Sequence, residues 1–225
     1  MNVAMLFSAL AVALILWFMT VRRLRSKPWL EKGSMEIEAG LAEMPPQRIG
    51  LWIFLGVVTS LFSLFMIMYV ERSSFPDWRP IADPQLLWIN TAFLVLASLA
   101  FQLARNATRH DRLAGVKLNL TAGGIFTIVF IAGQVAAWLQ LTADGRLFAT
   151  NPANTFFYLV TGLHALHLMG GLWVWTRTTF RVWKGLGSLE VTDVASIRLS
   201  VQLCSVYWHF LLLLWLVLFY FLITT

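Results

Sequence analysis

Long apolar runs separated by short polar segments make up most of this 225-residue chain. Each run has about 20 residues, the length at which an α-helix crosses the ~30 Å hydrocarbon core of a bilayer, and transmembrane β-strands are only about half as long. The pattern therefore predicts an all-α membrane protein with six transmembrane helices. We expect these helices at about residues 3–21, 49–70, 85–104, 118–141, 154–176 and 199–223.

The first apolar run is expected to stand apart from the other five. A cluster of basic residues follows it and none precedes it, which is the reverse of the charge order in a cleavable signal peptide. We therefore interpret residues 1–25 as a retained N-terminal transmembrane anchor. The polar stretch 26–47 is expected to be a cytoplasmic linker, and residues 48–225 a five-helix bundle.

Basic residues gather at alternate ends of the predicted helices. Only three of the 17 lysines and arginines, Arg72, Arg79 and Arg146, fall in the loops on the side with few basic residues. The positive-inside rule then places the basic loops in the cytoplasm and both chain termini outside. We expect a multi-pass protein of a cytoplasmic membrane, with the bacterial inner membrane as the expected location. Topology thus accounts for the net charge of +6, and no nucleic-acid partner is expected.

Composition agrees with a membrane protein. The chain is 59% hydrophobic and 12% charged, whereas soluble domains usually carry about 25% charged residues. The one cysteine, Cys204, excludes a disulfide within the chain and a metal site built from several thiolates.

Two histidines, His164 and His167, lie inside the fifth apolar run, where ionisable side chains are costly. Together with Thr161 and Gly171 they fall at helical spacing, so we expect one shared face that is buried in protein. Imidazole can bind haem or a metal ion, but no intramembrane carboxylate or thiolate cluster accompanies these residues. The pattern favours a structural or lipid-contacting role over ligation.

A second polar stripe follows the sixth apolar run, where Gln202, Ser205, His209 and Leu212 recur on one helix face. The simplest interpretation is hydrogen bonding between helices, each bond contributing about 0.6 kcal/mol. A proton-conducting path is the weaker alternative, because no carboxylate lies on the stripe.

Small residues permit close helix approach at three places, and at the two glycine pairs a notch for lipid is an equal alternative. Gly123-Gly124 and Gly170-Gly171 are adjacent pairs, and residues 132–137 contain two overlapping motifs with small residues four positions apart. Such motifs let a neighbouring helix come near the backbone.

Two of these segments resemble conserved segments of haem-copper oxidase subunit III. Thr161-Gly162, His164, His167 and Gly171 match the family pattern T-G-x-H-x-x-H-x-x-x-G. The segment 207–215, which reads Y-W-H-F-L-L-L-L-W, resembles the family segment Y-W-H-F-V-D-x-x-W. Residues 50–55 resemble the opening of the first core helix of the family, and together the matches frame residues 46–223.

The resemblance implies a non-catalytic, structural subunit III of a respiratory terminal oxidase, which oxidises cytochrome c or quinol, reduces oxygen and pumps protons. It implies haem and copper in subunit I, allows copper in subunit II, and implies no catalytic or metal-binding residue on this chain. The expected partners are subunit I in direct contact, subunit II, further small subunits and bound phospholipid. The residues expected to bind lipid or to act as structural polar groups are Arg48, Thr161, His164, His167, Arg198, Gln202 and His209.

Three positions depart from the family pattern. Val58, Gln202 and Leu212 stand where the family usually has intramembrane acids. A role that depends on those carboxylates is therefore not expected here.

Two other functions remain open at this stage. An accessory subunit of a nitric oxide reductase would share these motifs. A small transporter or channel is less favoured, because the sequence has no ring of charges and no pair of broken helices. The electron donor and the haem types of the complex are also left open.

Overall fold

The computed structural model describes residues 45–79, 85–110, 112–146, 151–184 and 191–224. The expected anchor at 1–25 and nearly all of the linker at 26–47 lie outside these ranges. The N-terminal helix expected at residues 3–21, and the side of the membrane on which each terminus lies, therefore stay predictions.

Five helices in the described residues are long and apolar enough to cross a membrane, which confirms the five spans predicted after residue 48. The chain is accordingly an integral membrane protein with an all-helical fold. The helices are α3 (Pro46–Ser73), α4 (Gln85–Arg109), α5 (Leu113–Ala143), α6 (Pro152–Lys184) and α7 (Val191–Thr224).

Proline and charge explain where several of these helices begin and end. Pro46 and Pro152 occupy the first positions of α3 and α6, where a missing backbone N–H costs nothing. Helix α6 continues past the predicted end at residue 176 to Lys184, and Arg181 and Lys184 lie in its last turn. Basic side chains there complement the partial negative charge of the helix C-terminus.

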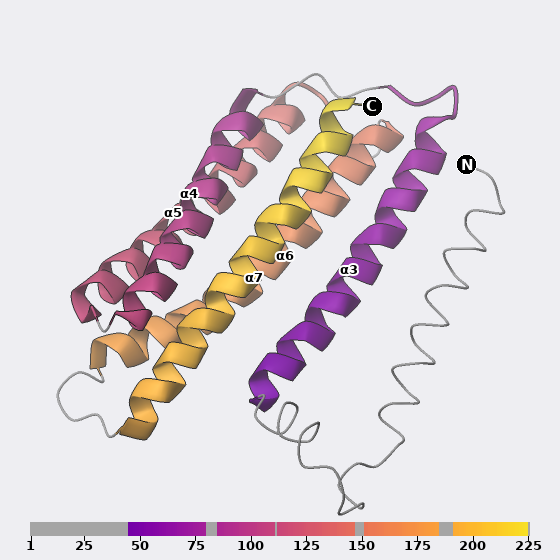
Figure 1. Ribbon diagram of the computed structural model, residues 1–225. Coiled ribbons are helices and arrows are strands. Elements are labelled where there is room, and N and C mark those ends of the chain that lie inside the picture. Colours follow the sequence, from indigo (N-terminus) through magenta and orange to yellow (C-terminus); the bar gives the residue numbers. More distant parts are fainter. Residues whose placement is uncertain (1–44, 80–84, 111, 147–150, 185–190, 225) are drawn as a thin grey trace, which may run out of the picture. The chain divides into compact units, whose positions relative to one another are not determined.

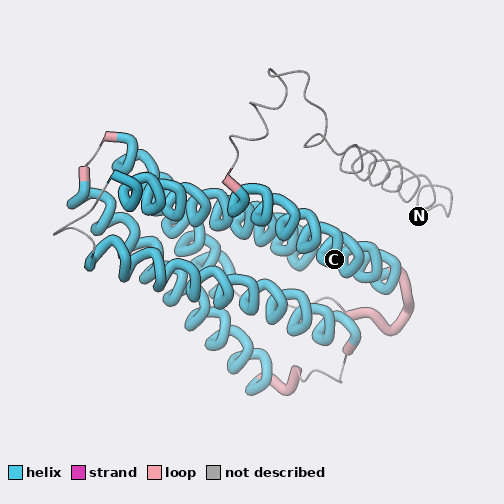
Figure 2. The backbone as a smooth tube through the Cα atoms, turned by 90° about the horizontal axis from the view of Figure 1, so that it is seen from below, coloured by secondary structure: helices cyan, strands magenta, loops and turns pink. Residues whose placement is uncertain are grey.

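Helices α4 to α7 form a closed ring within the compact unit of residues 51–225. Each packs on the next along the chain, and α4 closes the ring by packing on α7 (Figure 1). The view in Figure 2 shows the same long helices from below. The centre of the ring is filled by large side chains, among them Phe101, Phe130, Trp208 and Trp215, which are almost completely buried.

Helix α3 packs outside this ring, against α6 and α7. Its buried residues are Leu55, Val58, Phe62 and Tyr69, which form a single stripe at helical spacing. Val58 and Phe62 make a small cluster with Val160 of α6 and Leu218 of α7. The rest of α3 is mostly exposed, so the helix is attached along one narrow strip.

Glycines allow the ring to close tightly, as the sequence predicted at two pairs. The Phe101 ring lies against Gly123, where an added Cβ would come within 2.8 Å of it, and the Trp175 ring occupies the space beside Gly124. Gly171 lies against Tyr207, whereas nothing is within 4 Å of a Cβ on Gly170. Only one glycine of the second pair is therefore a contact residue.

The motifs at 132–137 are also divided between two environments. Gly133 lies against the Asn90 side chain of α4, and Ala137 is buried. Ala132 and Ala136 are exposed, so this pair does not form the predicted close approach within the described residues.

Three tryptophans join helices through threonine hydroxyls, an arrangement that we call the indole–hydroxyl bridges. Each indole Nε1–H donates to a threonine Oγ1 on another helix, and each threonine donates in turn to a carbonyl one turn back on its own helix. The bridges are Trp208–Thr127 (2.8 Å), Trp215–Thr91 (2.9 Å) and Trp138–Thr161 (3.1 Å). They tie α7 to α5, α7 to α4 and α5 to α6.

Candidate functional site

His164 lies inside the ring and is completely buried. Its Nε2 is 3.2 Å from the carbonyl oxygen of Leu211 on α7. Because a carbonyl only accepts, Nε2 carries the proton and donates. The imidazole packs against Trp215, at 5.1 Å between ring centroids, and against Phe130, at 5.8 Å. His164 therefore cross-links α6 to α7 and fills space next to α5.

His167 faces a different neighbour. It is half-buried, and its ring contacts Phe54 and Phe62 of α3, with centroid distances of 6.2 and 5.5 Å. Its Nδ1–H donates to the carbonyl of Leu163 on its own helix, at 2.7 Å. The Tyr207 hydroxyl donates to the backbone carbonyl of His167 at 2.9 Å, which adds a tie to α7.

The shared buried face predicted for α6 is only partly correct. Thr161, His164 and Gly171 are buried, as expected. His167 lies at the edge of that face and turns towards α3, because three residues of helix correspond to a rotation of about 300°. The two imidazoles thus stabilise two different helix contacts.

The predicted polar stripe on α7 does form hydrogen bonds to another helix. His209 Nδ1 is 3.0 Å from the hydroxyl of Ser98 on α4. One turn away, Ser205 Oγ donates to Gln102 Oε1 at 3.2 Å, and Gln102 Nε2 donates to Asn106 Oδ1 at 3.4 Å. We call these five residues the α4–α7 polar seam.

The three imidazoles do not converge. His164 lies in the ring, His167 against α3 and His209 on the outer side of α7 beside α4. No three His, Cys, Asp or Glu side chains of the described residues are grouped as a metal site would require. The three imidazoles therefore form no shared metal-ligand cluster in the described part of the chain.

The remaining predicted lipid or structural residues lie near helix ends. Arg48 is half-buried in the first turn of α3, and Arg198 is exposed near the start of α7. Gln202 is half-buried one turn further along α7. The roles of these three residues stay predictions.

The positions that lack the usual family acids lie in apolar surroundings. Val58 is 2% exposed and packs between α6 and α7. Leu212 packs against the main core of the ring. A carboxylate at either position would be removed from water.

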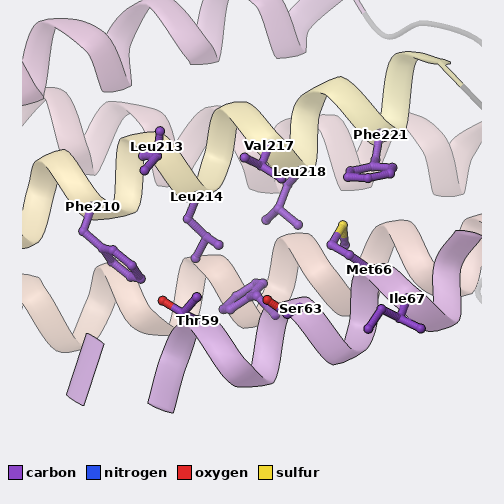
Figure 3. A pocket seen from close by; sticks show the side chains of 11 residues that line it. Thr59, Ser63, Met66, Ile67, Phe210, Leu213, Leu214, Val217, Leu218 and Phe221 are labelled. Atoms are coloured by element: carbon purple, nitrogen blue, oxygen red, sulfur yellow. The ribbon is translucent and has the colours of Figure 1, made fainter. Parts of the chain in front are cut away.

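An apolar groove lies between α3 and α7, with a volume of about 430 Å³. Figure 3 shows side chains of both helices around it, including Met66, Phe210, Leu214 and Phe221. The groove has only two polar residues, Thr59 and Ser63, and the Thr59 hydroxyl donates to the carbonyl of Leu55. Sequence reasoning missed this groove, because its residues look like ordinary apolar span residues until the two helices are placed side by side.

Comparison with known proteins finds relatives that match most of the chain, whereas no family model matches it. The chain is 28% identical over 178 residues to cytochrome c oxidase subunit 3 of Synechocystis sp., covering 77% of this chain and 73% of the relative. It is 29% identical over 175 residues to cytochrome bo(3) ubiquinol oxidase subunit 3 of Pseudomonas putida, covering 76% and 82%. Quinol oxidase subunit 3 of Bacillus subtilis is 26% identical over 177 residues, covering 76% and 83%.

Proposed function

We propose that this chain is a member of the subunit III family of haem-copper oxidases and serves as the non-catalytic third subunit of a respiratory terminal oxidase in a bacterial inner membrane. The observation that carries the proposal is the similarity to third subunits of oxidases over about three quarters of the chain. Haem and copper are assigned to the partner subunit I, with copper also allowed in subunit II. The relatives include cytochrome c and quinol oxidases, so both electron donors fit.

The positions of the imidazoles support a structural role. His164 joins α6 to α7, His209 joins α7 to α4, and His167 packs on α3. Each of the three is thus engaged in a contact between helices, which accounts for its presence in an apolar span. The proposed task of the chain is to stabilise subunit I, and the reaction with oxygen takes place in that partner.

The proposed test is to purify the complex through an affinity tag on this chain. We expect subunits I and II to be recovered with it, together with a haem Soret band and oxygen consumption supported by cytochrome c or quinol. A complex that consumes nitric oxide instead of oxygen would favour the reductase alternative. A chain that is recovered without any other subunit and without haem would favour a transporter and overturn the proposal.

We further propose that the α3–α7 groove holds an acyl chain of a phospholipid. The groove is apolar, opens between two membrane helices and has room for an extended hydrocarbon segment. Phenylalanine at Ser63, which lines the groove, should lower the amount of phospholipid retained by the purified complex. Phenylalanine at Ser60, an exposed residue that does not line it, is the matched control. Equal retention by Ser63→Phe and Ser60→Phe would exclude this groove as the lipid site.

A further inference from the structure

His209 is exposed although it lies in the middle of a membrane-spanning helix. Ionisable side chains in membrane spans almost always face protein or a water-filled cavity, because contact with hydrocarbon is costly. The hydrogen bond between Nδ1 and the Ser98 hydroxyl satisfies one side of the ring. An exposed imidazole at this depth indicates that another polar group covers it in the assembled protein.

The exposed residues around His209 have the spacing of a helix-packing seam. His209, Leu213, Leu216 and Tyr220 follow one another at intervals of four, three and four residues, so they form one stripe along α7. The last three are 62%, 42% and 61% exposed. We call this stripe the α7 outer face; Leu213 lies at its border with the α3–α7 groove, which it also lines. In Figure 1, α7 lies between α4 and α3.

The polar groups at this face select the kind of partner. In a neutral imidazole one ring nitrogen accepts a hydrogen bond and the other donates one. When the Ser98 hydroxyl donates to Nδ1 of His209, the second nitrogen, Nε2, carries the proton and can only donate. A hydrocarbon tail cannot accept from this N–H, whereas a helix with a hydrogen-bond acceptor can.

We propose that the α7 outer face is the docking surface for one transmembrane helix of the catalytic partner, and that this helix presents an acceptor side chain to His209. The inference rests on the proposed function, because it takes the partner to be a subunit of the oxidase. The contact with that subunit then lies on the α7 outer face. The apolar residues of the stripe supply packing area, and the imidazole fixes the register.

The first test compares two substitutions of His209 in the tagged complex. The side-chain amide of Asn can take the place of Nδ1 and keep the bond to Ser98 through its oxygen, whereas the longer side chain of Gln can place its amide N–H where the second ring nitrogen lies and donate outward. We expect His209→Gln to retain the partner and His209→Asn to weaken its retention about 3- to 20-fold, the range for loss of one interhelical hydrogen bond in a membrane. Retention is measured as haem recovered per mole of this chain after detergent washes.

The second test maps the contact directly. A photoreactive benzoylphenylalanine is placed at Leu216 on the α7 outer face or at Leu139, a residue of α5 that is 64% exposed. We expect cross-linking to a partner subunit from position 216 and not from position 139. Cross-links from position 216 only to lipid or to a second copy of this chain would overturn the inference, as would equal retention by the Gln and Asn variants.

The two proposals fail in different ways. A purified complex without haem would contradict the proposed function. A complex that contains haem and shows no cross-link from position 216 to its haem-bearing subunit would contradict only the docking surface.

Discussion

Replacing Gly171 with alanine tests how tightly α6 and α7 pack. An added Cβ would lie 2.6 Å from Cε1 of Tyr207 and 3.1 Å from Cη2 of Trp208. Its neighbour Gly170 provides the control, since a Cβ there meets nothing within 4 Å. The two substitutions are the same chemical change at adjacent positions of one helix.

The expected cost follows from how far the aromatic rings must move. Carbon atoms in contact prefer about 3.5–4.0 Å, so the Tyr207 ring would have to shift by ~1 Å. It is held by its hydroxyl, which donates to the carbonyl of His167, and Trp208 is held by its bridge to Thr127. Overpacking of this kind costs about 1–3 kcal/mol. The gain in helix propensity from Gly to Ala, at most about 1 kcal/mol, is common to both variants and cancels in the comparison.

The assay is reversible unfolding of the purified chain in mixed micelles, followed by tryptophan fluorescence as the fraction of denaturing detergent is raised. We expect Gly171→Ala to be about 1–3 kcal/mol less stable than Gly170→Ala. Equal stability of the two variants would refute the close contact between α6 and the aromatic rings of α7.

Three further changes test other contacts. Thr127→Val removes a hydroxyl at nearly constant shape and leaves the Trp208 indole N–H unpaired in the core, so unfolding should show a loss of about 1–2 kcal/mol; an unchanged protein would mean that this bridge contributes nothing. Val58→Glu places a carboxyl in an apolar contact and should destabilise the chain by about 2–3 kcal/mol. A carbodiimide that modifies buried carboxyls should label α3 of this variant but not α3 of the wild type. The side-chain hydrogen bond from Arg72 lowers the pKa of Asp77 below its usual 3.8. The ion pair therefore adds stability at pH values above 3.8, and this stability is lost as the pH falls through the lowered pKa. Protease protection of the adjoining loop should decrease in acid for the wild type and depend less on pH in Asp77→Asn.

The sequence predicted what depends on one helix at a time. The span positions followed from apolar length, and the hydrogen-bonding stripe on α7 followed from the spacing of Ser205 and His209. Which helices contact each other could not be predicted from the spacing within one helix. His167 and His164 are three residues apart and look alike in sequence, yet only the placement of α3 decides that one imidazole contacts it and the other does not.

The indole–hydroxyl bridges could not be predicted for a related reason. Trp208 and Thr127 are 81 positions apart, and each is an ordinary residue of its own span. Their pairing depends on the rotation and depth of two helices, which a single sequence does not encode in a local pattern. The same holds for the groove between α3 and α7, whose existence depends on how far apart the two backbones run.

The attachment of α3 by one narrow strip has a consequence for how this architecture can be modified. The ring of α4 to α7 makes its indole–hydroxyl bridges, the His164 contact and the α4–α7 polar seam without α3, so we treat the outlying helix as a separate module. A truncated version that starts at α4 should keep its interior intact and lose chiefly the surface that α3 shields. New segments could be appended ahead of α4, or exchanged there, without redesigning the interior.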